Sequence, residues 1–140
     1  LTKELIGSIN KVSQALKISE GTEVTKLTTL KFTDDEPLAL ITSYVPYSIC
    51  PRLLVRDLEN ESIYKFIEKE SGMLITHASR TLESVPSDES ESILLNIAIG
   101  SPLQCFESVI FLENGTPAEY SVAKYRSDLS RFKFELKRQL

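Results

Sequence analysis

The chain has 140 residues, 41% hydrophobic and 26% charged, which is typical of a single globular domain over 1–140. Its 16 Lys and Arg against 20 Asp and Glu give a net charge of −4, which argues against this segment gripping a nucleic-acid backbone by itself. No apolar run approaches the ~18 residues of a membrane span and the start lacks a signal-peptide core, so we expect no membrane partner and a cytoplasmic location. Because the first residue is Leu, we expect a fragment of a longer protein.

Runs of β-branched residues predict strands, and apolar residues at helical spacing predict short helices between them. Val12 and Leu16 lie four residues apart on one helix, whereas Ile63, Phe66 and Ile67 share a face of another. In chain order, the sequence predicts a helix over 11–16, strands over 23–32 and 38–45, a loop over 47–54, a helix from Ser62 to Gly72, a strand over 74–85, a helix opened by 87–89, and strands over 102–112 and 116–125.

Two regions of the chain match each other at an offset of 79 to 80 residues. Gly21 precedes Gly100 by 79 positions, and Pro37 precedes Pro117 by 80. Both copies predict a helix, a Gly turn, a strand, an acidic turn and a strand. We interpret this pattern as an internal duplication, and a cleft between equivalent halves is a natural ligand site.

The sequence contains no local catalytic signature, neither a Gly-rich phosphate loop nor a zinc-protease or nucleophile-elbow motif. The single His77 cannot build a multi-histidine metal site, and the distant Cys50 and Cys105 are expected to be reduced thiols. The acidic runs 34–36 and 87–91 favour a solvated hairpin tip and a helix start. We therefore expect no catalytic residue, no metal and no cofactor.

Each of several polar residues has two possible roles. His77 is either a half-buried strand residue or a ligand contact, and alternation places Arg80 on the opposite face. Arg80 either pairs with a surface carboxylate or holds an anion. Ser62 either caps its helix or, with the exposed N–H groups there, helps to bind an anion.

The stretch 116–128 is predicted to be a strand with two unlike faces. Ala118, Tyr120 and Val122 share one face. The other is either an ordinary solvated face or the polar wall of a binding pocket. Its residues are Glu119, Ser121, Ala123 and Tyr125.

The residues PAEYS at 117–121, followed by YRSD at 125–128 and by Phe132, resemble the C-terminal signature of the UTRA domain. This domain is the effector-sensing half of HutC-subfamily GntR bacterial transcription regulators. Further similarity covers nearly the whole chain, at 15–24, 35–37, 43–46, 62–64 and 100–103.

The resemblance implies a chorismate-lyase-like α/β (α+β) fold, an antiparallel sheet flanked by helices that binds a small molecule without converting it. It also implies a homodimer and DNA binding only through an N-terminal winged helix-turn-helix domain absent from this chain. Effectors of the family include sugar phosphates, amino-acid-derived acids, phosphonates and fatty acids.

In sugar-phosphate sensors of this type, two arginines on the first long strand help to hold the phosphate, and the matching positions are Thr29 and Lys31. A sugar-binding Glu on the returning strand aligns with Ile41. The loss of the arginine fork weakens the match to a standard sugar phosphate, although Lys31 still offers positive charge. The Ser and Tyr of the central helix and the Glu and Tyr of the last strand are kept as Ser62, Tyr64, Glu119 and Tyr125.

We expect an effector-binding and dimerisation domain for a small, anionic metabolite such as a sugar phosphate. The alternatives are a lyase-like enzyme on the same fold and a dimerisation module with a vestigial pocket. The candidate ligand-binding residues are Thr29, Lys31, Ser62, Tyr64, His77, Arg80, Glu119, Ser121 and Tyr125.

Overall fold

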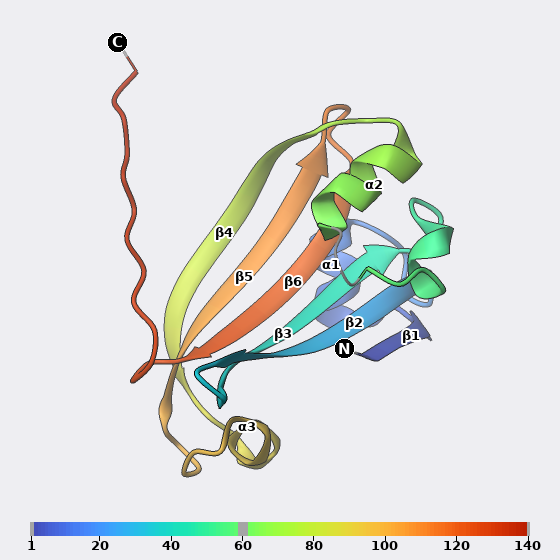
Figure 1. The fold of residues 1–140 in the computed structure, drawn as a ribbon. Helices are drawn as coiled ribbons and strands as arrows, with labels where there is room; N and C mark the ends of the chain where they lie inside the picture. The colour runs from blue at the N-terminus through green and yellow to red at the C-terminus, as the bar shows by residue number, and fades with distance from the viewer. Residues whose placement is uncertain (1, 59–61, 140) are drawn as a thin grey trace.

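The computed structural model describes residues 2–58 and 62–139. Six antiparallel strands form one sheet in the order β1-β2-β3-β6-β5-β4, with helices on both faces (Figure 1). This confirms the predicted antiparallel sheet flanked by helices. The elements are β1 Thr2–Gly7, α1 Asn10–Leu16, β2 Glu23–Thr33, β3 Glu36–Pro46, the 3₁₀ helix η1 Pro51–Leu54, α2 Ile63–Ser71, β4 Ile75–Pro86, α3 Glu89–Leu95, β5 Pro102–Leu112 and β6 Pro117–Arg126.

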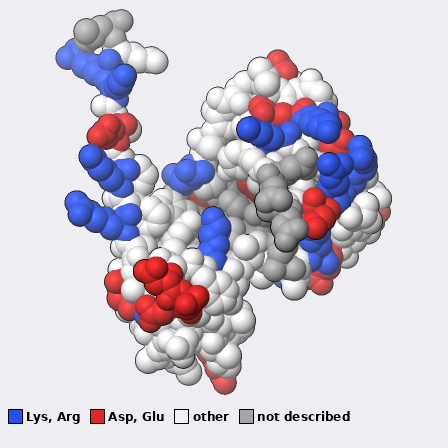
Figure 2. All heavy atoms as spheres, in the orientation of Figure 1, with Lys and Arg blue, Asp and Glu red and all other residues white. Residues whose placement is uncertain are grey.

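Two elements differ from the sequence-based expectation. The edge strand β1 was not predicted, because its six residues are mostly exposed and carry little apolar alternation. Part of the expected loop over 47–54 is the helix η1, which starts at Pro51, where the ring presets a helical φ angle. The acidic hairpin tip lies where it was expected, and it forms an acidic cluster over the β2–β3 turn in Figure 2.

Each face of the sheet has its own apolar core, because side chains alternate along the strands. On the face covered by α2, the helix residues Phe66 and Ile67 pack with residues of β2, β3, β5 and β6. On the face covered by α1, Val12 and Leu16 pack with Val24 and with Tyr120. The strands of the middle of the sheet are therefore covered on both sides.

A β-bulge interrupts the alternation of β6. Ile110 pairs with Glu119, whereas Phe111 pairs with Pro117, so that Ala118 is left without a partner. As a result Ala118 joins the core on the α2 face instead of sharing a face with Tyr120, as strict alternation predicted. Glu119 also lies on the α2 face, together with its paired neighbour Ile110.

The two halves of the chain share hydrogen bonds as well as element order. The side chains of Ser8 and Ser13 bond to each other at 3.0 Å, and those of Ser87 and Ser92 do so at 2.8 Å. Gly21 N–H donates to the carbonyl of Ser8, and the N–H of Gly100, 79 residues later, donates to that of Ser87. The strand order is symmetric about the β3–β6 pair. Common ancestry of the halves remains a prediction, and these repeated contacts support it.

Candidate functional site

A row of polar side chains crosses the α2 face of the sheet. Ser43 on β3 pairs with Ser121 on β6, which pairs with Ser108 on β5, which pairs with Arg80 on β4. Neighbouring strands lie about 4.8 Å apart, so the four side chains are consecutive neighbours. The Arg80 Nε donates a hydrogen bond of 2.8 Å to the Ser108 hydroxyl, which fixes the guanidinium against the sheet.

Glu119 lies beside this row, one step along β6 on the same face. Its side chain is buried, with a residue exposure of 3%. Burial raises the pKa of Glu119 to about 7, although a hydrogen bond with Ser43 and the positive charge of Arg80 both oppose the increase. Near neutral pH the carboxyl therefore exists in both its protonated and its ionised form. The protonated form can donate a hydrogen bond, whereas the ionised form only accepts.

Tyr64 on α2 completes the polar cluster from above the sheet. The residue is half-buried, and burial raises the pKa of its phenol. The charge of Glu119 raises this pKa further, whereas Arg80 lowers it. The helix thus brings a phenol within electrostatic reach of the carboxyl and the guanidinium.

A cavity of about 230 Å³ opens next to the polar row. Arg80, Ser108 and Ser121 form its polar end, and Tyr125 lies at its aromatic end. The complete lining consists of Arg80, Phe106, Ser108, Ser121, Ala123, Tyr125, Phe132 and Phe134. Three of the predicted site residues, Arg80, Ser121 and Tyr125, are therefore brought to one cavity, with Glu119 and Tyr64 beside it.

Thr29 and Lys31 lie on β2, far from Arg80 on β4. The two strands are separated by β3, β6 and β5, which places their backbones roughly 19 Å apart. Lys31 is exposed and pairs with Ala39 near the β2–β3 turn. Lys31 and Arg80 thus cannot hold the same small anion in this arrangement.

Ser62 and His77 also lie outside the cavity. Ser62 is the exposed residue that precedes α2, and its side chain makes no capping hydrogen bond. His77 is exposed and stacks on Phe111 with ring centroids 4.5 Å apart. Alternation along β4 separates His77 from Arg80, as predicted.

Sequence reasoning missed Ser43, Ser108 and the phenylalanine rings of the cavity, although it included Tyr125. Serines within strands carry no distinctive pattern, and only the strand pairing shows that two of them flank Ser121. Phe132 formed part of the recognised signature, but nothing in the sequence indicated that the chain returns past Phe106 after β6.

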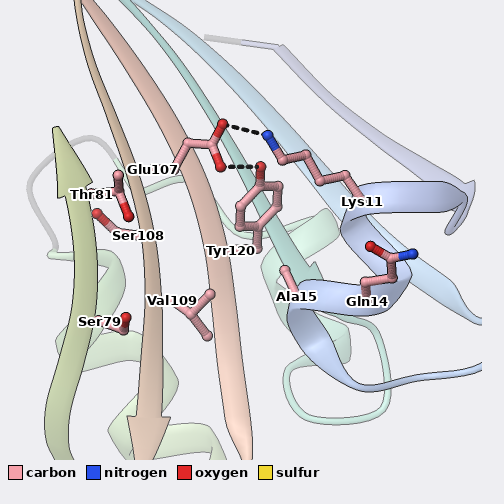
Figure 3. A pocket seen from close by; sticks show the side chains of 9 residues that line it. All are labelled: Lys11, Gln14, Ala15, Ser79, Thr81, Glu107, Ser108, Val109 and Tyr120. Atoms are coloured by element: carbon pink, nitrogen blue, oxygen red, sulfur yellow. Dashed lines mark hydrogen bonds and ion pairs between the residues drawn. The ribbon is translucent and has the colours of Figure 1, made fainter. Parts of the chain in front are cut away.

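A larger cavity, about 320 Å³, lies on the opposite face between α1 and the β4–β5 edge (Figure 3). Its cation, Lys11, forms an ion pair of 2.6 Å with Glu107, and Tyr120 donates to the same carboxylate at 3.3 Å. The charge of Lys11 is therefore already neutralised by Glu107. This makes the larger cavity less suited to an anion than the cavity beside Arg80.

Within residues 2–58 and 62–139, no three His, Cys, Asp or Glu side chains gather closely enough to hold a metal ion. Over the same residues, no helix is both long and apolar enough to cross a membrane. Cys50 and Cys105 are free thiols, and burial raises the pKa of each.

The model of the UTRA domain family matches residues 1–131, and the chain belongs to this family. Among curated relatives, the chain is 27% identical over 129 residues to the HTH-type transcriptional repressor NagR of Bacillus subtilis, which covers 92% of this chain and 53% of the repressor. It is 28% identical over 129 residues to the mannosyl-D-glycerate transport/metabolism system repressor MngR of Escherichia coli, with the same coverage of 92% and 53%. The chain thus spans about half the length of these relatives.

Solved structures agree with this family. A GntR-family transcriptional regulator from Enterococcus faecalis superposes with a TM-score of 0.86 at 25% identity, over 99% of this chain and 97% of that one. The effector domain of PhnF from Mycobacterium smegmatis superposes with a TM-score of 0.88 at 20% identity, over 99% and 85%. The relatives are transcriptional regulators, and the resemblance to a regulator's effector domain is confirmed.

Proposed function

We propose that this domain senses a small anionic metabolite in the cavity beside Arg80 and thereby controls DNA binding by an attached winged helix-turn-helix domain. One observation carries the proposal. A guanidinium held by Ser108 lines a cavity, and a buried carboxyl with a pKa near neutrality, that of Glu119, lies beside it on the same face of the sheet. Perturbed titratable groups at a cavity are typical of functional sites.

Each group has a distinct role in the proposal. Arg80 supplies a fixed positive charge for the anion, and the hydroxyls of Ser108 and Ser121 add hydrogen bonds. Glu119 adapts its protonation to the ligand, accepting from a hydroxyl or ammonium group when ionised. The ligand is bound without being converted, so no catalytic residue is assigned.

Binding alters the regulator by shifting a pre-existing equilibrium. A ligand that binds one conformation of a cytoplasmic homodimer more tightly raises the population of that conformation, and the DNA-binding domains respond to the shift. The relatives' identity as transcriptional regulators supports this coupling. Whether the chain itself dimerises is a part of the proposal that sedimentation of the domain would test.

The first test is a thermal-shift screen of sugar phosphates, phosphonates and carboxylates. We expect at least one anion to raise the melting temperature, and Arg80→Gln to lower its affinity at least tenfold, because the site loses its charge-assisted hydrogen bonds. Lys137→Gln, which removes an exposed charge from the tail, serves as the control and should leave affinity unchanged. If no anion in the panel binds, the pocket is vestigial. If binding does not depend on Arg80, the proposed site is wrong.

A further inference from the structure

The outer wall of the Arg80 cavity includes two phenylalanines of the C-terminal tail. The UTRA model ends at residue 131, whereas Phe132 and Phe134 line the cavity. These residues belong to the C-terminal tail 130–139, which has no helix or strand and whose end extends away from the body of the domain (Figure 1). The tail therefore contributes two rings to the wall of the cavity.

The root of the tail is held in place by hydrogen bonds. The Gln104 amide donates to the hydroxyl of Ser130 at 2.8 Å and to its carbonyl at 3.2 Å. The Ser130 hydroxyl donates in turn to the carbonyl of Arg126 at 2.6 Å. Since Gln104 is on β5 and Arg126 ends β6, the tail is fixed to the sheet immediately before Phe132.

Phe132 then packs against two rings of the sheet. Its centroid lies 4.6 Å from that of Phe106 and 4.9 Å from that of Tyr125, with interplanar angles of 75° and 81°. Phe106 and Tyr125 are themselves 6.1 Å apart at 87°. These are edge-to-face contacts, which favour a fixed arrangement of the three rings. Phe132 is therefore held in a fixed position in the wall of the cavity.

Phe134 differs because it lines the cavity but is 62% exposed. A ligand that covers a large apolar side chain at the mouth of a cavity removes apolar surface from water, which favours binding. Leu136, two residues further, is 93% exposed and does not line the cavity. The apolar surface offered to a ligand thus ends at Phe134.

The cavity has one charged end and one aromatic end. Arg80, Ser108 and Ser121 suit an anionic group, whereas the four rings offer a single hydroxyl, that of Tyr125, which is too few partners for a ring of hydroxyls. A cavity of about 150 Å³ lined by apolar side chains is sufficient for benzene, so the 230 Å³ available here accommodates a ring-sized body with an anionic group attached.

We infer that Phe132 and Phe134 select effectors in which an apolar, ring-sized body is joined to a phosphate, phosphonate or carboxylate. The inference rests on the proposed function, because it requires that the Arg80 cavity binds the effector. It adds the tail as the segment that determines which anion is preferred.

The experiment is calorimetric titration with two matched pairs of probes. Phenyl phosphate is compared with methyl phosphate, and phenylacetate with acetate, so that each pair shares its anionic group and differs in the ring. We expect at least one ring-bearing probe to bind tenfold or more tightly than its partner, because the ring removes apolar surface from water when it enters the cavity. Phe132→Ala should remove most of this preference and leave the affinity for the small anion unchanged, whereas the control Leu136→Ala should change neither.

Phe134→Ser provides a second variant that does not depend on the packing of the ring cluster. Because Phe134 is exposed, its replacement should preserve folding, and we expect it to reduce the preference for the ring several-fold. Equal affinity for both members of each pair, with binding still lost in Arg80→Gln, would overturn the aromatic selection and leave the proposed function standing. If no probe binds while other anions of the screening panel do, the selection is likewise wrong. A panel without any hit would remove the proposed function itself.

Discussion

The two halves of the sheet, 2–46 and 75–126, have a common framework and differ in what they present to α2. Each half has a short helix, a positive-φ glycine and two long strands with a bulge near the hairpin end. At the positions equivalent to Glu119, Ser121 and Tyr125, however, the first half carries apolar side chains. They are Ala39, Ile41 and Val45, each 80 residues earlier.

The comparison separates the determinants of the fold from those of the site. Buried leucines and the repeated serine contacts occur in both halves and specify the framework. The polar row and Glu119 require only a few side chains on one face, most of them in the second half, with Ser43 of β3 as the contribution of the first half. A ligand site can therefore arise in such a sheet without any change in its topology.

The equivalence of the frameworks is tested by Leu16→Ala and Leu95→Ala. The two side chains, 79 residues apart, are 1% and 0% exposed, so each substitution should lower the free energy of unfolding by about 2–5 kcal/mol. Because the two leucines hold equivalent positions in the repeated framework and are equally buried, we expect the two losses to agree within about 1 kcal/mol, measured by urea denaturation. A loss confined to one variant would show that the halves contribute unequally to the cooperative core.

The pH dependence of stability tests the difference between the halves. The folded-state pKa of Glu119 is raised to about 7, so the folded protein favours the protonated form. This contribution is complete below the unfolded pKa of about 4.5 and is lost as the pH rises through 7, by an amount on the order of 3 kcal/mol. Glu119→Gln should therefore gain roughly this much stability relative to the wild type between pH 4 and pH 8.

Urea denaturation at pH 4, 6 and 8 measures this gain, and Glu20→Gln, at an exposed position, is the control that should leave the pH profile unchanged. Parallel profiles for Glu119→Gln and the wild type would mean that the carboxyl is ionised and solvated at neutral pH. In that event the buried carboxyl no longer supports the proposed site.

The smallest expected effect concerns the glycine turns. Gly21 has a φ of 86° and Gly100 a φ of 84°, and a Cβ at either position would meet no heavy atom within 4 Å. Replacement by Ala therefore costs only the left-handed backbone strain, about 1–2 kcal/mol for each. Gly7→Ala is the matched control, because its φ is not positive and its Cβ would make ordinary contacts from 3.4 Å. Unequal losses for Gly21→Ala and Gly100→Ala in denaturation experiments would limit the correspondence of the halves.

Periodicity predicted much of this structure because a strand has only two faces. Alternation was sufficient to group Glu119 with Ser121 and Tyr125 and to separate Arg80 from His77. It failed at Ala118, because an unpaired residue has no signature in a single strand and appears only when the partner strand is known. The position of Ser62 before α2 and the end of that helix at Gly72 were also predicted.

The cavity could not be predicted in the same way, since it depends on which strands are neighbours. The candidate ligand-binding residues included both Lys31 and Arg80, but the strand order places three strands between β2 and β4. Ser43 and Ser108 become relevant only through their pairing with Ser121. The tail rings come near the cavity because Gln104 holds Ser130, a contact between residues 26 positions apart.

The bulge at Ala118 also determines which single-residue deletions strand β6 can tolerate. A deletion of Ala118 would remove the unpaired residue and leave every later side chain of β6 on its present face. A deletion within 120–124 would instead move the side chains on one side of the deletion to the opposite face of the sheet, so that either Glu119 or Tyr125 would point to the α1 face. Single-codon deletions in this strand should therefore be tolerated at one position and abolish ligand sensing a few codons later.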